Sequence, residues 1–285
     1  MTTAPDPPLI GGARTALHVM SYNIRYDRHA TQPGETDYWP ERILPLQRLL
    51  RLERPAVLGV QEALSHQLTA VEAALPPHFR MIGYGRDGGS KGEYSAILYD
   101  AHRLQLLEWD QFWLSETPRL IGSITWGNGV ARIVTWGRFF DTVTRQEILV
   151  INTHFDHDSD EAKLRSAHAI LDLVRVFQPR LPTILTGDFN SSAGSSSTYG
   201  AFLESGLFLD TWAAAAEHRT PTYGTTPRYG DPVEGGRRID WILSSPDISV
   251  LEAAINTTRP DGRYPSDHAA VQALVLLPDA PGLPD

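Results

Sequence analysis

The sequence contains no cysteine, which excludes disulfide bonds, thiolate metal sites and a cysteine nucleophile. It also has no apolar run of membrane-spanning length and no basic-then-apolar start of the kind found in signal peptides. Basic residues are in deficit, since 25 Lys and Arg stand against 34 Asp and Glu, for a formal net charge of −9. This balance argues against a broad basic face for nucleic acid. We expect a cytoplasmic protein without stable membrane association, and a monomer by default.

The length and composition are those of one large folded unit. At 285 residues, with 41% hydrophobic and 21% charged residues, the chain fits a single α/β domain better than two small ones. Proline and glycine are frequent at both ends. We predict a flexible N-terminal arm over 1–15, a single domain over 16–277 and a C-terminal tail over 278–285. No internal repeat is found.

Hydrophobic periodicity predicts many strands and few helices. The expected helices cover 39–53, a segment that Ser65 caps, 160–177, and 199–204, which Gly206 stops. Pro45 either kinks the first helix or marks its first turn. The expected strands are 17–22, 56–60, 94–99, 104–109, 131–140, 148–153, a segment around 184–188, 238–243 and 269–276. Such strands in series favour two mixed sheets packed face to face with helices outside.

The segment Gly187-Asp188-Phe189-Asn190 follows one of these buried strands. Alternation along a strand puts Asp188 and Asn190 on one side and Phe189 on the other. Gly187 allows another group to approach the backbone closely. Taken alone, this segment is an ordinary Asp/Asn turn, and it gains meaning only from similar residues elsewhere.

Six further polar residues lie where strands end or begin, namely Asn23, Glu62, His154, Asp240, Asp267 and His268. Each has a structural explanation by itself, as a turn former, a helix-start charge or a satisfied core histidine. Asp240 is harder to explain in that way, because it interrupts an apolar strand and a buried carboxylate needs a partner. Their shared position at strand ends favours one common site.

The chemistry of this set is that of hard oxygen ligands. Glu62, Asp188, Asp267 and the carbonyls of Asn23 and Asn190 suit Mg²⁺ or Mn²⁺, and they do not suit zinc. The two histidines add cationic or proton-transferring groups that can contact phosphoryl oxygens. A metal, a carboxylate that prepares water and a charged histidine together indicate a phosphoester hydrolase.

These residues resemble the endonuclease/exonuclease/phosphatase superfamily, and within it the bacterial metal-dependent hydrolases. The resemblance runs in the family's order from about Val19 to Leu276. It implies a DNase I-like, four-layered α/β/β/α sandwich of two mixed, largely antiparallel sheets. The motifs that carry it are Ser21-Tyr22-Asn23-Ile24-Arg25, Gln61-Glu62, Gly92-Glu93-Tyr94, Asn152-Thr153-His154, Gly187-Asp188-Phe189-Asn190, Arg238-Ile239-Asp240-Trp241 and Ser266-Asp267-His268.

The resemblance implies a metal side of the site. Glu62 matches the principal metal carboxylate, with Asn23 beside it. Asp267 matches a second metal-side carboxylate, acting through water or at a second metal position. Asp188 matches the residue that orients or deprotonates the attacking water, and Asn190 one that holds the phosphate and the metal.

The resemblance also implies a phosphate side. His268 matches the histidine that contacts the scissile phosphate, and Asp240 its orienting partner. His154 with Glu93 matches a second histidine–carboxylate pair, as in the DNase I branch. The abasic-site enzymes carry a tyrosine at the position of His154, so the chain departs from that branch.

Substrate choice depends on loops, and the candidate loops are 27–38, 83–92, 115–129 and 217–237. The last contains Thr222-Tyr223-Gly224, which resembles a Thr-Phe-His-Gly element without its histidine. Arg25 and Arg42 either contact phosphate or form salt bridges at the edge of the core. The segment Val130 to Phe140, together with Trp109, Trp113 and Trp126, is unusually aromatic and either packs in the core or stacks on a base or sugar.

We expect a small phosphodiester, phosphomonoester or short oligonucleotide as the substrate. A nuclease acting on DNA or RNA is the alternative. A lipid phosphodiesterase of the sphingomyelinase kind and a non-catalytic binding module are more distant ones. The module would lack the equivalent of Glu62, Asp188, Asp240 or His268, and all four are present.

Overall fold

The computed structural model describes residues 7–11 and 15–278. Residues 1–6, 12–14 and 279–285, which include most of the expected arm and tail, lie outside the described part. Within the expected arm, the Leu9 backbone N–H donates to the Glu53 carboxylate at 3.2 Å, and Ile10 packs against Ala254 and Leu274. The division into arm, domain and tail stays a prediction. Among the described helices, none is long and apolar enough to span a membrane.

The described strands form two sheets. The first has the order β10-β12-β13-β1-β2-β4-β3. Its strands are β1 (Leu17–Asn23), β2 (Val57–Gln61), β3 (Phe79–Ile82), β4 (Ile97–Asp100), β10 (Glu217–His218), β12 (Ser249–Asn256) and β13 (Ala270–Leu276). The second has the order β5-β6-β7-β8-β11-β9. Its strands are β5 (Leu104–Trp113), β6 (Ile133–Asp141), β7 (Gln146–His154), β8 (Thr183–Asp188), β9 (Leu209–Asp210) and β11 (Asp240–Ser244).

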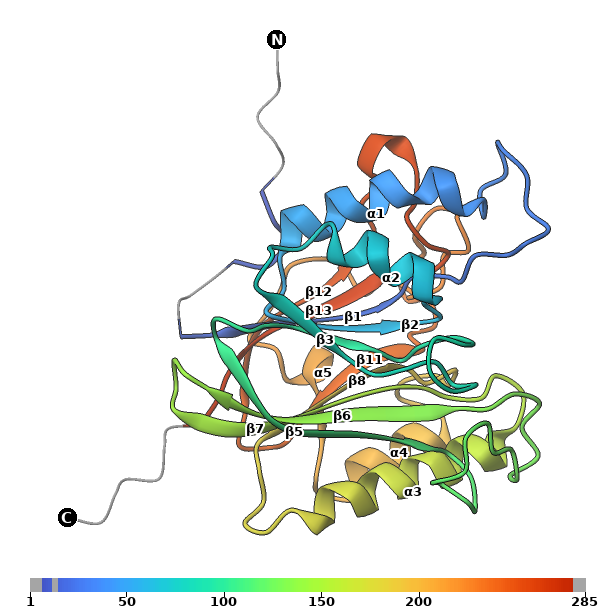
Figure 1. Cartoon of the computed structure of the whole chain (residues 1–285). Helices are drawn as coiled ribbons and strands as arrows, with labels where there is room; N and C mark the ends of the chain where they lie inside the picture. Colours follow the sequence, from blue (N-terminus) through green and yellow to red (C-terminus); the bar gives the residue numbers. More distant parts are fainter. Residues whose placement is uncertain (1–6, 12–14, 279–285) are drawn as a thin grey trace.

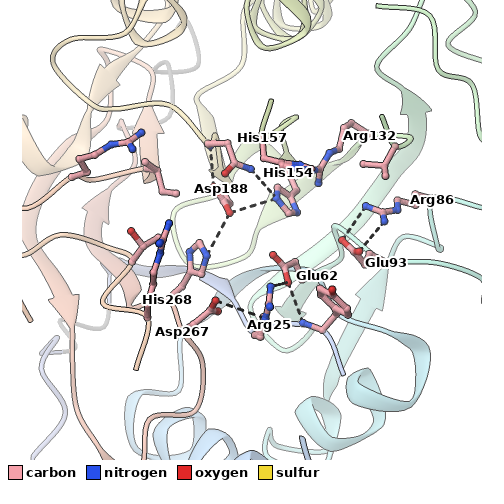
Figure 2. Close-up of a pocket in the computed structure, with 17 residues that line it drawn as sticks. Arg25, Glu62, Arg86, Glu93, Arg132, His154, His157, Asp188, Asp267 and His268 are labelled. Atoms are coloured by element: carbon pink, nitrogen blue, oxygen red, sulfur yellow. Dashed lines mark hydrogen bonds and ion pairs between the residues drawn. The ribbon is translucent and has the colours of Figure 1, made fainter. Parts of the chain in front are cut away.

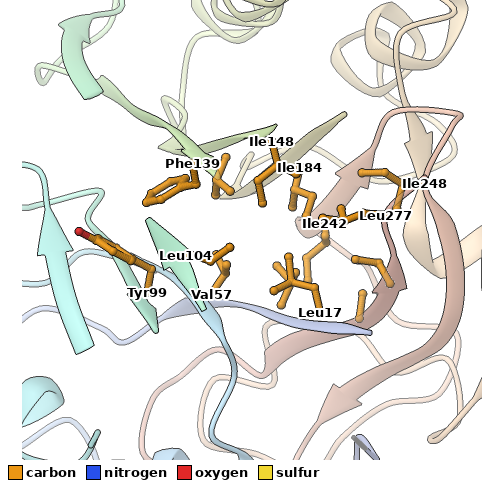
Figure 3. Close-up of a cluster of buried hydrophobic side chains, with 14 of the residues drawn as sticks. Leu17, Val57, Tyr99, Leu104, Phe139, Ile148, Ile184, Ile242, Ile248 and Leu277 are labelled. Carbon is orange, nitrogen blue, oxygen red and sulfur yellow. The ribbon is translucent and has the colours of Figure 1, made fainter. Parts of the chain in front are cut away.

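Helices cover the outer face of each sheet (Figure 1). The helices α1 (Trp39–Glu53) and α2 (Ser65–Glu72) pack on the first sheet, and α3 (Asp160–Val176) and α4 (Ser197–Glu204) pack on the second. A short helix α5 (Thr211–Ala214) and a 3₁₀ turn η1 (Pro260–Gly262) complete the described elements. Between the sheets lies an apolar core that includes Val57, Phe139 and Ile184, all fully buried (Figure 3). This arrangement confirms the expected α/β/β/α sandwich.

Strand pairing brings the polar strand ends to one edge of the sandwich. In the first sheet β1 and β2 are parallel, so Asn23 lies opposite Gln61, the residue before Glu62. In the second sheet β7 and β8 are parallel and place His154 opposite Asp188. The antiparallel strand β11 places Asp240 on the other side of Asp188. Carboxyl ends of parallel neighbours meet at the same edge, which is why residues far apart in sequence share one site.

A buried polar junction joins the two sheets just below this edge. Asn152 of β7 donates its amide hydrogens to the carbonyl oxygens of Val60 and Ala96, both at 2.9 Å, across the sandwich. Gln61 and Thr186 donate to the Asn152 amide oxygen at 2.7 and 3.0 Å. These buried hydrogen bonds between strands of the two sheets hold the strand ends in a defined register.

Most expected elements are present, with local differences. The helix 39–53 is confirmed at both ends, with Pro45 inside it, and the helix expected over 160–177 ends at Val176. The expected cap of α2 is wrong, since Leu64 occupies the N-cap and the Gln67 side chain accepts its backbone N–H at 3.1 Å. The strand β12 was not predicted, so the expected strand over 238–243 is not the neighbour in sequence of 269–276. The strand β12 pairs with β13 along its length. Buried and exposed residues alternate only weakly along β12, so the sequence pattern does not reveal this strand.

Candidate active site

A cavity of about 560 Å³ opens at the edge where the polar strand ends meet. Its size is that of a small-molecule site. Figure 2 shows the side chains of Glu62, Asp188 and His268 pointing toward one another inside it. Sequence-predicted residues that line the cavity are Glu62, Glu93, His154, Asp188, Asn190, Asp267 and His268, together with Arg25. Asn23 and Asp240 lie behind this lining and contact it.

Asn23 holds two carboxylates together. Its amide nitrogen donates to Glu62 Oε1 and to Asp188 Oδ2, both at 3.0 Å. Its amide oxygen accepts the backbone N–H of Arg25 at 3.0 Å, which fixes which end of the amide faces the carboxylates. In this geometry Asn23 positions the two carboxylates through its amide nitrogen. The role of its carbonyl oxygen as a metal ligand stays a prediction, since that oxygen keeps a second lone pair beside the one that the Arg25 N–H occupies.

His268 and Asp240 form a buried pair. The Nδ1 atom of His268 lies 3.1 and 3.0 Å from the two carboxylate oxygens of Asp240. Burial by itself lowers the pKa of His268, but the carboxylates of Asp240, Asp188 and Asp267 outweigh it and raise the pKa well above the usual value. The ring is therefore an imidazolium at neutral pH, and its Nε2 faces Asp188 at 3.9 Å. Asp240 has the buried partner that its place in an apolar strand required.

Asp188 carries an unfavourable charge. Burial first, and then the nearby carboxylate of Asp240, raise its pKa to about 7, although His268 and the hydrogen bonds from Asn190 and Asn23 oppose the shift. Glu62 differs: burial alone would raise its pKa, but His268, the hydrogen bond from Asn23 and Arg25 together lower it. A carboxylate that titrates near neutral pH beside one that stays ionised is the pattern of a general base next to a permanent anion.

His154 is a neutral ring in this site. The Asn190 amide donates to its Nε2 at 3.1 Å and to the Phe155 carbonyl at 3.0 Å, so Nε2 is an acceptor. Burial and the nearby Arg132 and Arg86 lower the pKa of His154 well below the usual value. Asn190 does reach the site, but by a turn instead of strand alternation: β8 ends at Asp188, and the Asn190 backbone N–H donates to Asp188 Oδ1 at 2.9 Å.

The expected pairing of His154 with Glu93 does not form. Glu93 accepts two hydrogen bonds from the guanidinium of Arg86, at 2.8 and 3.0 Å, and burial raises the pKa of Glu93. The fork of an arginine satisfies both oxygens of a carboxylate at once, so it outcompetes a single imidazole N–H. Figure 2 places this pair on the opposite side of the cavity from His268.

The donor set fits a hard divalent cation. Ligand atoms of Glu62, Asp188 and His268 lie within 4.8 Å of one another. The Asp267 carboxylate lines the same cavity, 3.7 Å from Arg25 Nε, and burial raises its pKa. Carboxylate oxygens without any thiolate are the ligands that Mg²⁺ and Mn²⁺ prefer. A His268 ring that is protonated and bound to Asp240 has no free lone pair on Nε2, so the fit of this site to a cation rests on its carboxylates.

Backbone strain is concentrated at this site. Eight described residues other than glycine have a positive φ, and five of them are at or beside the cavity: Arg25, Glu62, Asn190, Arg228 and Tyr229. Each such conformation costs on the order of 1–3 kcal/mol and persists only where surrounding contacts enforce it. Gly187 allows β7 and β8 to approach closely just before Asp188, because a Cβ at this position would lie 2.8 Å from the Thr153 carbonyl oxygen.

Sequence reasoning missed most of the arginines in the cavity. Arg86, Arg132, Arg228 and Arg237 line it together with Arg25, although the chain as a whole is acidic. The only sequence signal was that Arg86, Arg228 and Arg237 fall in two of the four candidate loops. Arg42, by contrast, is fully buried and donates to backbone carbonyls of Ile24, Arg25, Tyr26 and Pro265, so its role is structural.

Trp113 and Trp126 do not line the cavity, and Trp109 on the edge strand β5 is 39% exposed. Trp113 is buried against Ala131 and Ile133, and its indole N–H donates to the Arg86 carbonyl at 2.7 Å. The Trp126 indole donates to Glu116 at 2.8 Å. The packing interpretation of this region accounts for both contacts. Trp113 in addition helps to position Arg86.

The sequence and the structure are both similar to those of known proteins. The family model described as "Endonuclease/Exonuclease/phosphatase family" matches residues 20–268. A crystal structure of a family protein from Bacteroides thetaiotaomicron is 32% identical, with a TM-score of 0.85, over 92% of this chain and 95% of that one. A mannosyl-6-phosphatase of the same organism is also 32% identical, with a TM-score of 0.84, over 92% of this chain and all of that one.

More distant structures share the fold. The human Nocturnin catalytic domain is 16% identical, with a TM-score of 0.71, over 95% of this chain and 99% of that one. No match was found among curated proteins. The family match spans the strand ends that build the site, from β1 to His268. The chain therefore belongs to the endonuclease/exonuclease/phosphatase family and is a phosphoester hydrolase.

Proposed function

We propose that this protein hydrolyses a small phosphoester in a reaction that depends on Mg²⁺ or Mn²⁺. The observation that carries the proposal is the convergence of Glu62, Asp188 and His268 within 4.8 Å, with Asp240 paired to the far side of His268. Glu62 and Asp267 would hold the ion beside Asp188. When bound, a divalent cation supplies Lewis-acid activation of the phosphate and of the attacking water.

The chain's own groups divide the remaining work. Asp188, with a pKa raised to about 7, can take a proton from water near neutral pH. The His268 imidazolium can donate from Nε2 to a phosphoryl oxygen as negative charge develops there. Asp240 keeps Nδ1 of that ring protonated and fixes its orientation. Asn190 holds neutral His154 through its amide, which leaves the Asn190 oxygen for phosphate or metal.

A small substrate is favoured by the size of the cavity, about 560 Å³. It is also supported by the similarity to a mannosyl-6-phosphatase, which is 32% identical to this chain. A nuclease remains the second candidate, because the arginines that line the cavity are groups that bind backbone phosphates. The acidic net charge outside the cavity opposes a long polyanion.

The test is a panel of sugar phosphates, nucleotides, aryl phosphates, phosphodiesters and short oligonucleotides, each with Mg²⁺, with Mn²⁺ and with EDTA. We expect turnover of at least one small phosphoester with metal and none in EDTA. The Glu62→Gln/Asp188→Asn double variant is the control for contaminating phosphatases. Equal turnover with and without chelator, or turnover that the double variant retains, would overturn the proposal.

A further inference from the structure

The five arginines of the cavity differ in their partners. Three of them pair with carboxylates: Arg25 with Asp37, Glu62 and Asp267, Arg86 with Glu93, and Arg132 with Asp156 at 3.9 Å. The other two, Arg228 and Arg237, are exposed and have no carboxylate within 4.0 Å among the described residues. The Nε of Arg237 donates to the Ser192 hydroxyl at 2.9 Å. These two guanidinium groups therefore bring uncompensated positive charge to the cavity.

The backbone that carries Arg228 is held firmly beside the catalytic residues. The Arg228 backbone N–H donates to the Asp267 carbonyl oxygen at 2.9 Å, one residue before His268. Arg228 and Tyr229 both have the left-handed backbone, with φ of 52° and 63°. The Tyr229 hydroxyl donates to Asp37 at 2.7 Å. Two consecutive residues with left-handed backbone, each hydrogen-bonded to another segment, hold Arg228 in a defined position at the wall of the cavity.

Arg237 is tied to the same wall. Its carbonyl oxygen accepts the backbone N–H of Thr225 at 2.9 Å, and the Thr225 carbonyl accepts the N–H of Ala269 at 2.8 Å. The Thr225 hydroxyl accepts the backbone N–H of Asp240 at 3.1 Å. Thr225 therefore connects Arg237 to Asp240 and to the strand that follows His268. The backbone of both arginines is thus connected to the residues on either side of His268, Asp267 and Ala269.

We propose that Arg228 and Arg237 bind the phosphate dianion of the substrate and make this hydrolase select phosphate monoesters over diesters. The inference rests on the proposed function. A monoester is close to a dianion above pH 7, because its second pKa is about 6, whereas a diester carries one charge. Two arginines without carboxylate partners match this additional charge, and their planar forks suit the three non-bridging oxygens of a monoester, of which a diester keeps only two. An oligonucleotide, with diester linkages only, would gain less from them.

The test uses two substrates with the same leaving group, para-nitrophenyl phosphate and bis(para-nitrophenyl) phosphate, at pH 8 with Mg²⁺ or Mn²⁺. In the Arg228→Gln/Arg237→Gln double variant, we expect kcat/KM for the monoester to fall by about 10- to 100-fold. For the diester we expect a change of no more than about two- to threefold. Arg219→Gln removes a positive charge from the same loop outside the cavity, where Arg219 pairs with Glu217, and should leave the ratio unchanged.

A second measurement does not depend on turnover. Calorimetric titration with inorganic phosphate should show at least about tenfold weaker binding to the double variant than to the unaltered protein. Equal losses on both aryl substrates, or unchanged phosphate affinity, would overturn the role of these arginines while leaving the proposed function intact. Failure of the unaltered protein to hydrolyse any phosphoester would overturn the proposed function, and the phosphate titration would still decide whether the two arginines bind the dianion.

Discussion

The Asp188→Asn substitution tests the electrostatics of the site directly. The pKa of Asp188 is raised from 3.8 to about 7 by burial and by Asp240. A group whose pKa is higher in the folded than in the unfolded state makes the folded state bind more protons between these two values. Stability therefore falls as pH rises from about 4 to 7. The difference between these two pKa values corresponds to roughly 4 kcal/mol of stability lost above pH 7.

The asparagine removes this charge but keeps the shape. Its amide nitrogen would face the donating amide of Asn23, so the hydrogen bond that now joins these side chains at 3.0 Å is lost, at a cost of about 1–2 kcal/mol. In EDTA at pH 8 we therefore expect the variant to be more stable by about 2–3 kcal/mol. The gain should shrink at pH 5. The variant should lose activity by roughly 10²-fold or more, because it lacks the carboxylate that we propose as the general base.

Urea unfolding followed by tryptophan fluorescence, at pH 5 and pH 8 in EDTA, measures the stability at both pH values. Asp37→Asn is the matched control. Burial alone would raise the pKa of Asp37, but hydrogen bonds from Tyr229 and Arg25 lower it, so this variant should lose stability at pH 8. An Asp188→Asn protein less stable than the unaltered one at pH 8, or a gain of the same size at both pH values, would refute the reasoning.

Three further predictions follow from the site. Glu62→Gln should lose most of its affinity for Mg²⁺ and Mn²⁺ in calorimetric titration, because it removes an ionised ligand; undiminished affinity would place the metal elsewhere. His268→Ala and Asp240→Asn should each lower kcat by about 10²-fold, and the double variant should lose little more, since the two residues act as a unit. Additive losses in kcat would contradict their pairing. Finally, kcat/KM should be higher on a small phosphoester than on plasmid DNA, with weak salt dependence; efficient nicking that falls steeply with salt would favour the nuclease.

Local pattern was enough to predict the layers and the edge that holds the site. The apolar runs that end at Asn23, Glu62 and Asp188 are strands in the structure, and the helix over 39–53 has the predicted bounds. Hydrophobic periodicity reports burial on one face, and parallel pairing brings strand ends together, so polar residues at those ends predict a shared site. Asp240 could be predicted as a member of this site too, because a carboxylate in an apolar strand requires a buried partner.

The partner of each side chain depended on the tertiary structure. Glu93 pairs with Arg86 and not with His154, and the Asn23 amide turns its nitrogen to the carboxylates because Arg25 occupies its oxygen. Such pairings depend on how closely side chains from segments far apart in the chain approach one another, which local sequence pattern does not determine. The set of arginines that lines the cavity is the clearest case. An acidic sequence without a dense basic run still gathers five arginines around one cavity, because folding, and not composition, determines which charges become neighbours.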